Sequence, residues 1–133
     1  MENTTITTSR TLKLVLVGPP QSHKTNFVRT CLGANDPFDT KYIPTIGVEV
    51  HPVRFFHQGE DVCFNLWDCA GSEQFGGLRE GYWIRADAFL VFDSTSSYSQ
   101  ERLALIREQY PQAKVVEWPH SSMPPPKILK KFL

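Results

Sequence analysis

The sequence predicts an α/β domain built on a mostly parallel sheet, with one antiparallel hairpin strand and helices on both faces. Short β-rich runs alternate along the chain with segments of helical periodicity, which is typical of parallel sheets. A glycine-containing turn at 57–61 joins two of the runs into a hairpin. The strand expected at 88–93 begins with an unbroken apolar run, which suits a central strand covered on both faces.

The first half of the chain supplies a strand, a helix and the hairpin. Residues 12–17 form a short β-rich run that predicts a buried strand. Residues 24–32 place their apolar side chains on one face of a 3.6-residue period, which predicts a helix. The hairpin joins strands at 47–56 and 62–68, and Pro52 predicts a sheet edge or a bulge within the first of them.

Loops and a second helix follow in the rest of the chain. Prolines predict a loop over 35–44, and glycines predict another over 70–81, with a helix beginning inside or just after it. A capping-box pattern that starts at Ser97 opens a helix through Tyr110. Residues 114–118 fit one more strand.

The chain divides into one domain and two flanking segments. We expect a flexible N-terminus at 1–11, a domain at 12–118 and a Pro-rich, basic tail at 119–133, which the prolines predict to be extended. With 133 residues, of which 41% are hydrophobic, the chain suffices for one domain with its own core.

Composition narrows the classes of partner. The 14 basic and 14 acidic residues leave no net charge, so no overall field draws the chain to nucleic acid. The apolar runs are too short to span a membrane, and we expect no secretory signal. The three cysteines fit no zinc motif, and His51 is expected on the surface or in a loop. We expect neither nucleic acid nor membrane as partner, and a reducing cytoplasmic or nuclear location.

The loop that follows the first strand is a candidate phosphate site. Residues 18–25 match three of the four fixed positions of the pattern G-x-x-x-x-G-K-[ST], with His23 in place of the second glycine. In such a loop, backbone N–H groups and the start of the helix bind phosphates. The alternative is a tight strand-to-helix turn with an incidental Lys-Thr pair. The candidate phosphate-binding residues here are Gln21, Ser22, His23, Lys24, Thr25 and Asn26.

Downstream motifs resemble the small GTPases of the Ras superfamily. Pro44-Thr45 resembles the first switch of that family, and Asp68-Cys69-Ala70-Gly71 resembles the D-x-x-G element of its second switch. The runs GVEVHP at 47–52 and FGGLREGY at 75–82 closely resemble the Ran branch, the nuclear-transport GTPases. The resemblance extends from about residue 12 to residue 93.

The resemblance implies GTP or GDP and Mg²⁺ as cofactors. It implies that Lys24 binds phosphate, and that Thr45 and the Gly71 N–H contact the γ-phosphate. The Mg²⁺ residues that it implies are Thr25, Thr45 and, through water, Asp68. It also implies partners that read the two switches, namely transport receptors or GTPase regulators. Phe38 stands where the family places an aromatic ring against guanine, although a loop Phe packed on the domain is the alternative.

Several positions depart from the family pattern. Ser72 replaces the glutamine that orients the attacking water, which predicts very slow or absent hydrolysis at this catalytic position. His23 either crowds the nucleotide or points outward at little cost, and Pro20 replaces another glycine. The guanine-specificity motif Asn-Lys-x-Asp is missing. We therefore expect an incomplete, divergent GTPase domain that lacks the last strand and helices of the family.

Without the last helix of the family, the strand at 12–17 is expected to leave an apolar face uncovered. Such a face predicts a partner or self-association. The function predicted from these features is a Ran-like GTP/GDP-binding switch, linked to nuclear transport, with impaired hydrolysis. A nucleotide-free pseudo-GTPase that acts as a decoy or adaptor is the alternative, and a decayed fragment without function is a further one.

Overall fold

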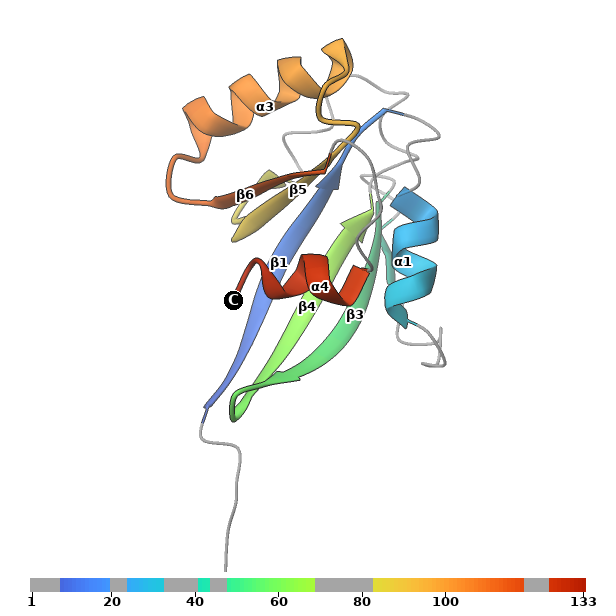
Figure 1. The fold of residues 1–133 in the computed structure, drawn as a ribbon, viewed down its shortest axis with the longest axis vertical. Coiled ribbons are helices and arrows are strands. Elements are labelled where there is room, and N and C mark those ends of the chain that lie inside the picture. Colours follow the sequence, from blue (N-terminus) through green and yellow to red (C-terminus); the bar gives the residue numbers. More distant parts are fainter. Residues whose placement is uncertain (1–7, 20–23, 33–40, 44–47, 69–82, 119–124) are drawn as a thin grey trace, which may run out of the picture.

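The computed structural model describes residues 8–19, 24–32, 41–43, 48–68, 83–118 and 125–133. Its elements, in order, are β1 (Thr8–Val17), α1 (Lys24–Leu32), β2 (Lys41–Ile43), β3 (Val48–His57), β4 (Glu60–Asp68), β5 (Ala88–Phe92), α3 (Ser97–Gln109), β6 (Lys114–Trp118) and α4 (Pro125–Lys130). Figure 1 shows α1 and α4 in front of the sheet and α3 beyond its β5–β6 end.

The strands form one sheet in the order β2-β3-β4-β1-β5-β6. β1 lies at its centre and pairs parallel with both β4 and β5, and β6 continues the parallel part beside β5. β3 and β4 form the antiparallel hairpin. The predicted α/β class with a mostly parallel sheet is therefore confirmed. The predicted loop over 35–44 is wrong for 41–43, because Tyr42 and its neighbours pair with the start of β3 as strand β2.

The core forms two layers, one on each face of the sheet. Side chains alternate along β1, so Leu14 and Leu16 enter one layer, whereas Val15 and Val17 enter the other. The first layer is completed by α1 and α4, and the second by α3. All five residues of β5 are buried, as expected for a strand covered on both faces.

The C-terminal segment corrects two predictions. Residues 125–130 form helix α4 rather than an extended tail. Hydrogen-bonded turns follow the helix as far as Leu133. The apolar spacing of Ile128, Leu129 and Phe132 puts all three on one helical face, and all three are buried in the layer with α1. A proline in the first turn is compatible with a helix. Leu14 and Leu16 are therefore covered, and the predicted apolar face is not exposed at these residues.

The N-terminal strand begins earlier than its sequence pattern indicates. We predict a flexible segment up to residue 11, but Thr8–Thr11 pair with Glu60–Cys63 of the hairpin. Arg10 Nε lies 2.8 Å from a carboxylate oxygen of Glu60, which adds an ion pair to this ladder. The long β4 thus supplies the partner that the polar segment needs to extend the strand.

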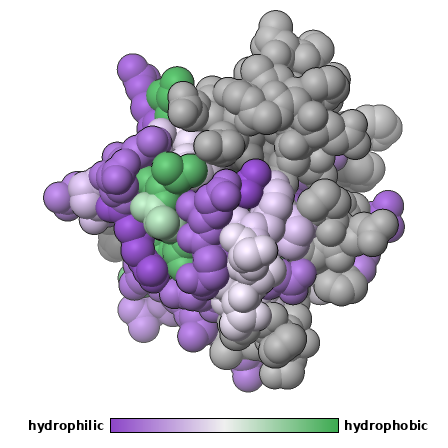
Figure 2. Space-filling model, turned by 90° about the horizontal axis from the view of Figure 1, so that it is seen from above, coloured by the Kyte–Doolittle hydropathy of each residue, from purple (hydrophilic) through white to green (hydrophobic). Residues whose placement is uncertain are grey.

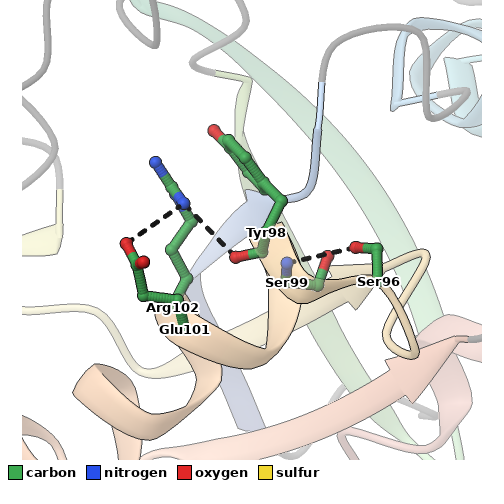
Figure 3. A network of polar contacts seen from close by, with 5 residues as sticks. All are labelled: Ser96, Tyr98, Ser99, Glu101 and Arg102. Carbon is green, nitrogen blue, oxygen red and sulfur yellow. Dashed lines mark hydrogen bonds and ion pairs between the residues drawn. The ribbon is translucent and has the colours of Figure 1, made fainter.

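Helix α3 is capped one residue before the predicted position. The side chain of Ser96, not Ser97, accepts a hydrogen bond from the Ser99 backbone N–H at 3.1 Å (Figure 3). The Ser99 hydroxyl in turn donates to the Phe92 carbonyl oxygen at 2.6 Å, which ties the start of the helix to the end of β5. The Arg102 guanidinium lies over the Tyr98 ring, 3.4 Å from its centroid.

The surface seen from the top of Figure 1 is mostly hydrophilic over the described residues (Figure 2). Its hydrophobic residues show only as small areas among polar ones. Within the described part of the chain, no helix is long and apolar enough to cross a membrane.

Candidate functional site

The candidate site lies where β1 and β4 end side by side. The two strands are parallel neighbours, and their register sets Leu16 opposite Asp68, the last residue of β4. Gly18 follows β1 directly, and the chain re-enters described structure at Lys24, the first residue of α1. Ligands of open α/β sheets bind outside the carboxyl ends of the strands, so this edge is the expected place for a ligand.

Lys24 brings a buried cation to this edge. The residue is 4% exposed, and its ammonium donates hydrogen bonds to the carbonyl oxygens of Gly18 at 2.5 Å and of Pro19 at 3.0 Å. These contacts connect the start of α1 to the end of β1. The first turn of α1 has no acidic side chain, so the positive end of the helix dipole reinforces the ammonium charge. The pair is suited to an anion such as phosphate.

Asp68 brings a buried carboxylate to the same edge. It is 7% exposed and faces Glu49 across the β3–β4 ladder. Glu49, His51 and Asp68 each offer a ligand atom, and these atoms lie within 4.8 Å of one another. His51 Nε2 lies 3.3 Å from a carboxylate oxygen of Glu49. Carboxylate oxygens are the ligands that Mg²⁺ prefers, so the donor set fits a divalent cation.

Glu49 and His51 are site residues that the sequence reasoning missed. The surface or loop position predicted for His51 is wrong, because the residue is buried on β3. Alternation along a strand puts Glu49 and His51 on one face, and this alternation is visible in the sequence. The sequence pattern does not give the register of β3 against β4, and this register brings both residues to the end of β4 beside Asp68.

The structure describes only part of the predicted site. Lys24 and Asp68 lie at the same edge of the sheet, where β1 and β4 end. Thr25 is in α1, and Asn26 is exposed in the first turn of that helix. The predicted residues outside the described ranges are Gln21, Ser22, His23, Phe38, Thr45, Gly71 and Ser72. For these, the predicted roles stay predictions.

Cys31 lies on α1, the helix that begins at Lys24. Burial raises the pKa of its thiol to about 12, so the thiolate is absent at neutral pH. Cys31 is therefore a packing residue of the core layer shared by α1 and α4 and not a nucleophile.

One comparison with known proteins names the family. A family model described as the Ras family matches residues 13–119. The matched range contains the whole helix α1, the hairpin and the strands up to β6, and thus both Lys24 and Asp68. Because the match covers most of the chain, the chain belongs to the Ras family of GTP-binding switches.

Proposed function

We propose that this protein is a nucleotide-dependent switch that binds GTP and GDP with Mg²⁺ at the joint edge of β1 and β4. The observation that carries the proposal is the buried ammonium of Lys24 at the start of α1, tied to the carbonyls of the preceding loop. Lys24 would hold the phosphates, and Asp68 would hold the cation on the other side. When bound, Mg²⁺ supplies positive charge that neutralises the phosphate oxygens.

We further propose that the switch belongs to the Ran branch and takes part in nuclear transport, in the cytoplasm, the nucleus or both. The runs at 47–52 and 75–82 support this, because they resemble that branch more closely than small GTPases in general. Glu49 and His51 come from the first of these runs and lie beside Asp68. Regulators or transport receptors would read the switch regions, as partners of small GTPases do.

The proposed switch turns off slowly. Ser72 stands where the family has the glutamine that orients the attacking water, and a serine side chain is too short for that role. A single-turnover measurement with bound GTP tests this, and hydrolysis at the rate of an ordinary small GTPase contradicts it. The matched variant is Ser72→Gln, which should accelerate the reaction.

Base selectivity is proposed to be weak. The residues after β6 are Pro119, His120 and Ser121, where the family carries its Asn-Lys-x-Asp motif. Without the aspartate carboxylate that binds the guanine edge, the protein is expected to bind GTP and ATP with similar affinity. Phe38 is proposed as a stacking residue, which any purine accepts.

A pseudo-GTPase is the second candidate, favoured by His23 at a position where the family needs glycine. In that case the protein keeps the surfaces that partners recognise and binds no nucleotide. Titration of the purified protein with GTP, GDP and ATP, each with Mg²⁺, separates the two. Binding of GTP and ATP with similar affinity supports the weakly selective switch, whereas no binding up to millimolar concentration supports the pseudo-GTPase.

A further inference from the structure

Lys13 contacts both β4 and the segment before β5, on the face of the sheet opposite α1. Its ammonium lies over the Trp67 ring, 3.6 Å from the ring centroid, and donates a hydrogen bond to the Ile84 carbonyl oxygen at 2.7 Å. Trp67 is the residue before Asp68 at the end of β4. Ile84 lies in the segment that leads into β5. One side chain on β1 thus contacts both.

The main chain of Lys13 strengthens the connection to the segment before β5. Its N–H donates to a carboxylate oxygen of Asp87 at 2.7 Å, and its carbonyl accepts from the Asp87 N–H at 3.0 Å. Nearby, the Ala86 N–H donates to the Trp83 carbonyl at 3.0 Å, which closes a turn around Ile84. The Ile84 carbonyl is therefore held in place by the backbone, and it gives the Lys13 ammonium a fixed acceptor.

The electrostatic environment opposes the charge that these contacts need. Burial lowers the pKa of Lys13 to about 8, and the Asp87 carboxylate acts in the opposite direction. The alternation of side chains along β3 and β4 puts Asp61, Cys63 and Arg54 on the same face as Lys13, and Arg85 follows Ile84. Burial raises the pKa of the Cys63 thiol, so this group stays protonated where Lys13 titrates. Burial destabilises the charged form of Lys13. The half-buried ammonium is therefore better explained by a role in positioning its partners than by a contribution to stability.

We propose that Lys13 is a positioning residue that fixes the end of β4. Its charged amine holds Trp67 toward the Ile84 carbonyl and thereby sets the place of Asp68, the next residue along the chain. The inference rests on the proposed function, because it assigns Asp68 to the cation side of the nucleotide site. A cation over an indole with a carbonyl as second partner is a directional contact, which a neutral side chain of equal length does not reproduce.

The first test needs no nucleotide. In protein labelled with 5-fluorotryptophan, ¹⁹F NMR resolves Trp67, Trp83 and Trp118, and Trp→Phe variants assign them. We expect the Trp67 signal to shift with a midpoint near pH 8, as the pKa of Lys13 requires, and the other two to stay constant. Lys13→Met should abolish the transition and Lys13→Arg should keep the low-pH signal up to pH 9.5. A Trp67 signal that does not titrate, or that titrates equally in Lys13→Met, overturns the proposal.

The second test measures the dissociation constant of GTP with Mg²⁺. We expect Lys13→Met to weaken binding about three- to ten-fold, the fold-change that corresponds to losing one partly buried cation–π contact. Lys13→Arg should restore it, and the control Lys114→Met on the exposed side of β6 should bind as the wild type does. Equal binding by Lys13→Met and wild type overturns the link to Asp68. Absence of binding by the wild type contradicts the proposed function instead, and the ¹⁹F experiment then decides the role of Lys13 alone.

Discussion

The ammonium of Lys24 donates a hydrogen bond to the carbonyl oxygen of Gly18 at 2.5 Å, so the first residue of α1 is fastened to the residue after β1. This contact keeps a cation buried at the carboxyl edge of the sheet, where a helix start adds its own positive potential. A phosphate offers the same ammonium a charged acceptor, and hydrogen bonds between charged groups are stronger than those to a neutral carbonyl. The buried ammonium and the helix start together make this position suitable for binding an anion.

Asp68 is expected to act through Mg²⁺ and not through the nucleotide alone. Asp68→Asn should weaken GTP binding on the order of ten-fold in Mg²⁺, the usual cost of losing a group that holds a metal through water. In EDTA the variant and the wild type should bind alike. Titrations of both proteins in both buffers measure this. Asp61→Asn, at the other end of β4, is the matched control and should behave as the wild type.

Helix α4 is expected to be part of the folded core. Leu129 is 1% exposed in the layer shared with α1, so Leu129→Ala should cost about 2–4 kcal/mol of unfolding free energy. Lys130→Ala, on the exposed side of the same helix, should change it by less than about 0.5 kcal/mol. Urea unfolding compares the two variants. Equal, small effects would show that α4 adds little to the core.

The N-cap of α3 can be tested by a pair of adjacent serines. Ser96→Ala should destabilise the protein by about 1 kcal/mol, because it removes the acceptor of the Ser99 N–H. Ser97→Ala should have almost no effect, although the sequence pattern makes Ser97 the expected cap. Thermal or urea unfolding decides between them. A larger loss at Ser97 than at Ser96 contradicts the observed cap.

The stability contributed by Lys13 is expected to rise with pH. Burial lowers the pKa of Lys13 from 10.5 to about 8, so between these values the unfolded chain binds more protons than the folded one. Under that condition the unfolding free energy increases with pH. The difference in unfolding free energy, wild type minus Lys13→Met, should therefore increase from pH 8 to pH 10. A difference that decreases over this range has the wrong sign.

Local sequence patterns predicted those helices and strands whose structure depends mainly on their own residues. Helix α1 occupies 24–32 as its apolar spacing predicts, and β5 and β6 lie where apolar and β-branched runs place them. The class of the sheet follows from the alternation of strands and helices. Lys24 and Asp68 could be predicted as candidate site residues because both belong to short motifs with a fixed relation to strand ends.

Features that depend on distant partners were not predictable in this way. The prolines at 124–126 dominate the local pattern, whereas α4 forms because Ile128 and Leu129 pack in the layer with α1. The first residues of β1 are polar, and they become a strand through the pairing with β4. Glu49 and His51 become site residues through the register of the hairpin, which the sequence pattern does not specify.

A calorimetric titration of the nucleotide-free protein with GTP in Mg²⁺ tests directly whether Lys24 binds a nucleotide. We expect saturable binding at one site by the wild type. We expect Lys24→Met to lose roughly ten-fold or more in affinity, because hydrogen bonds to a charged group are worth about 1.5–3 kcal/mol. Lys127→Met, on the exposed side of α4, should bind as the wild type does. Equal affinity of Lys24→Met and wild type, or no binding by either up to millimolar GTP, would contradict nucleotide binding through Lys24.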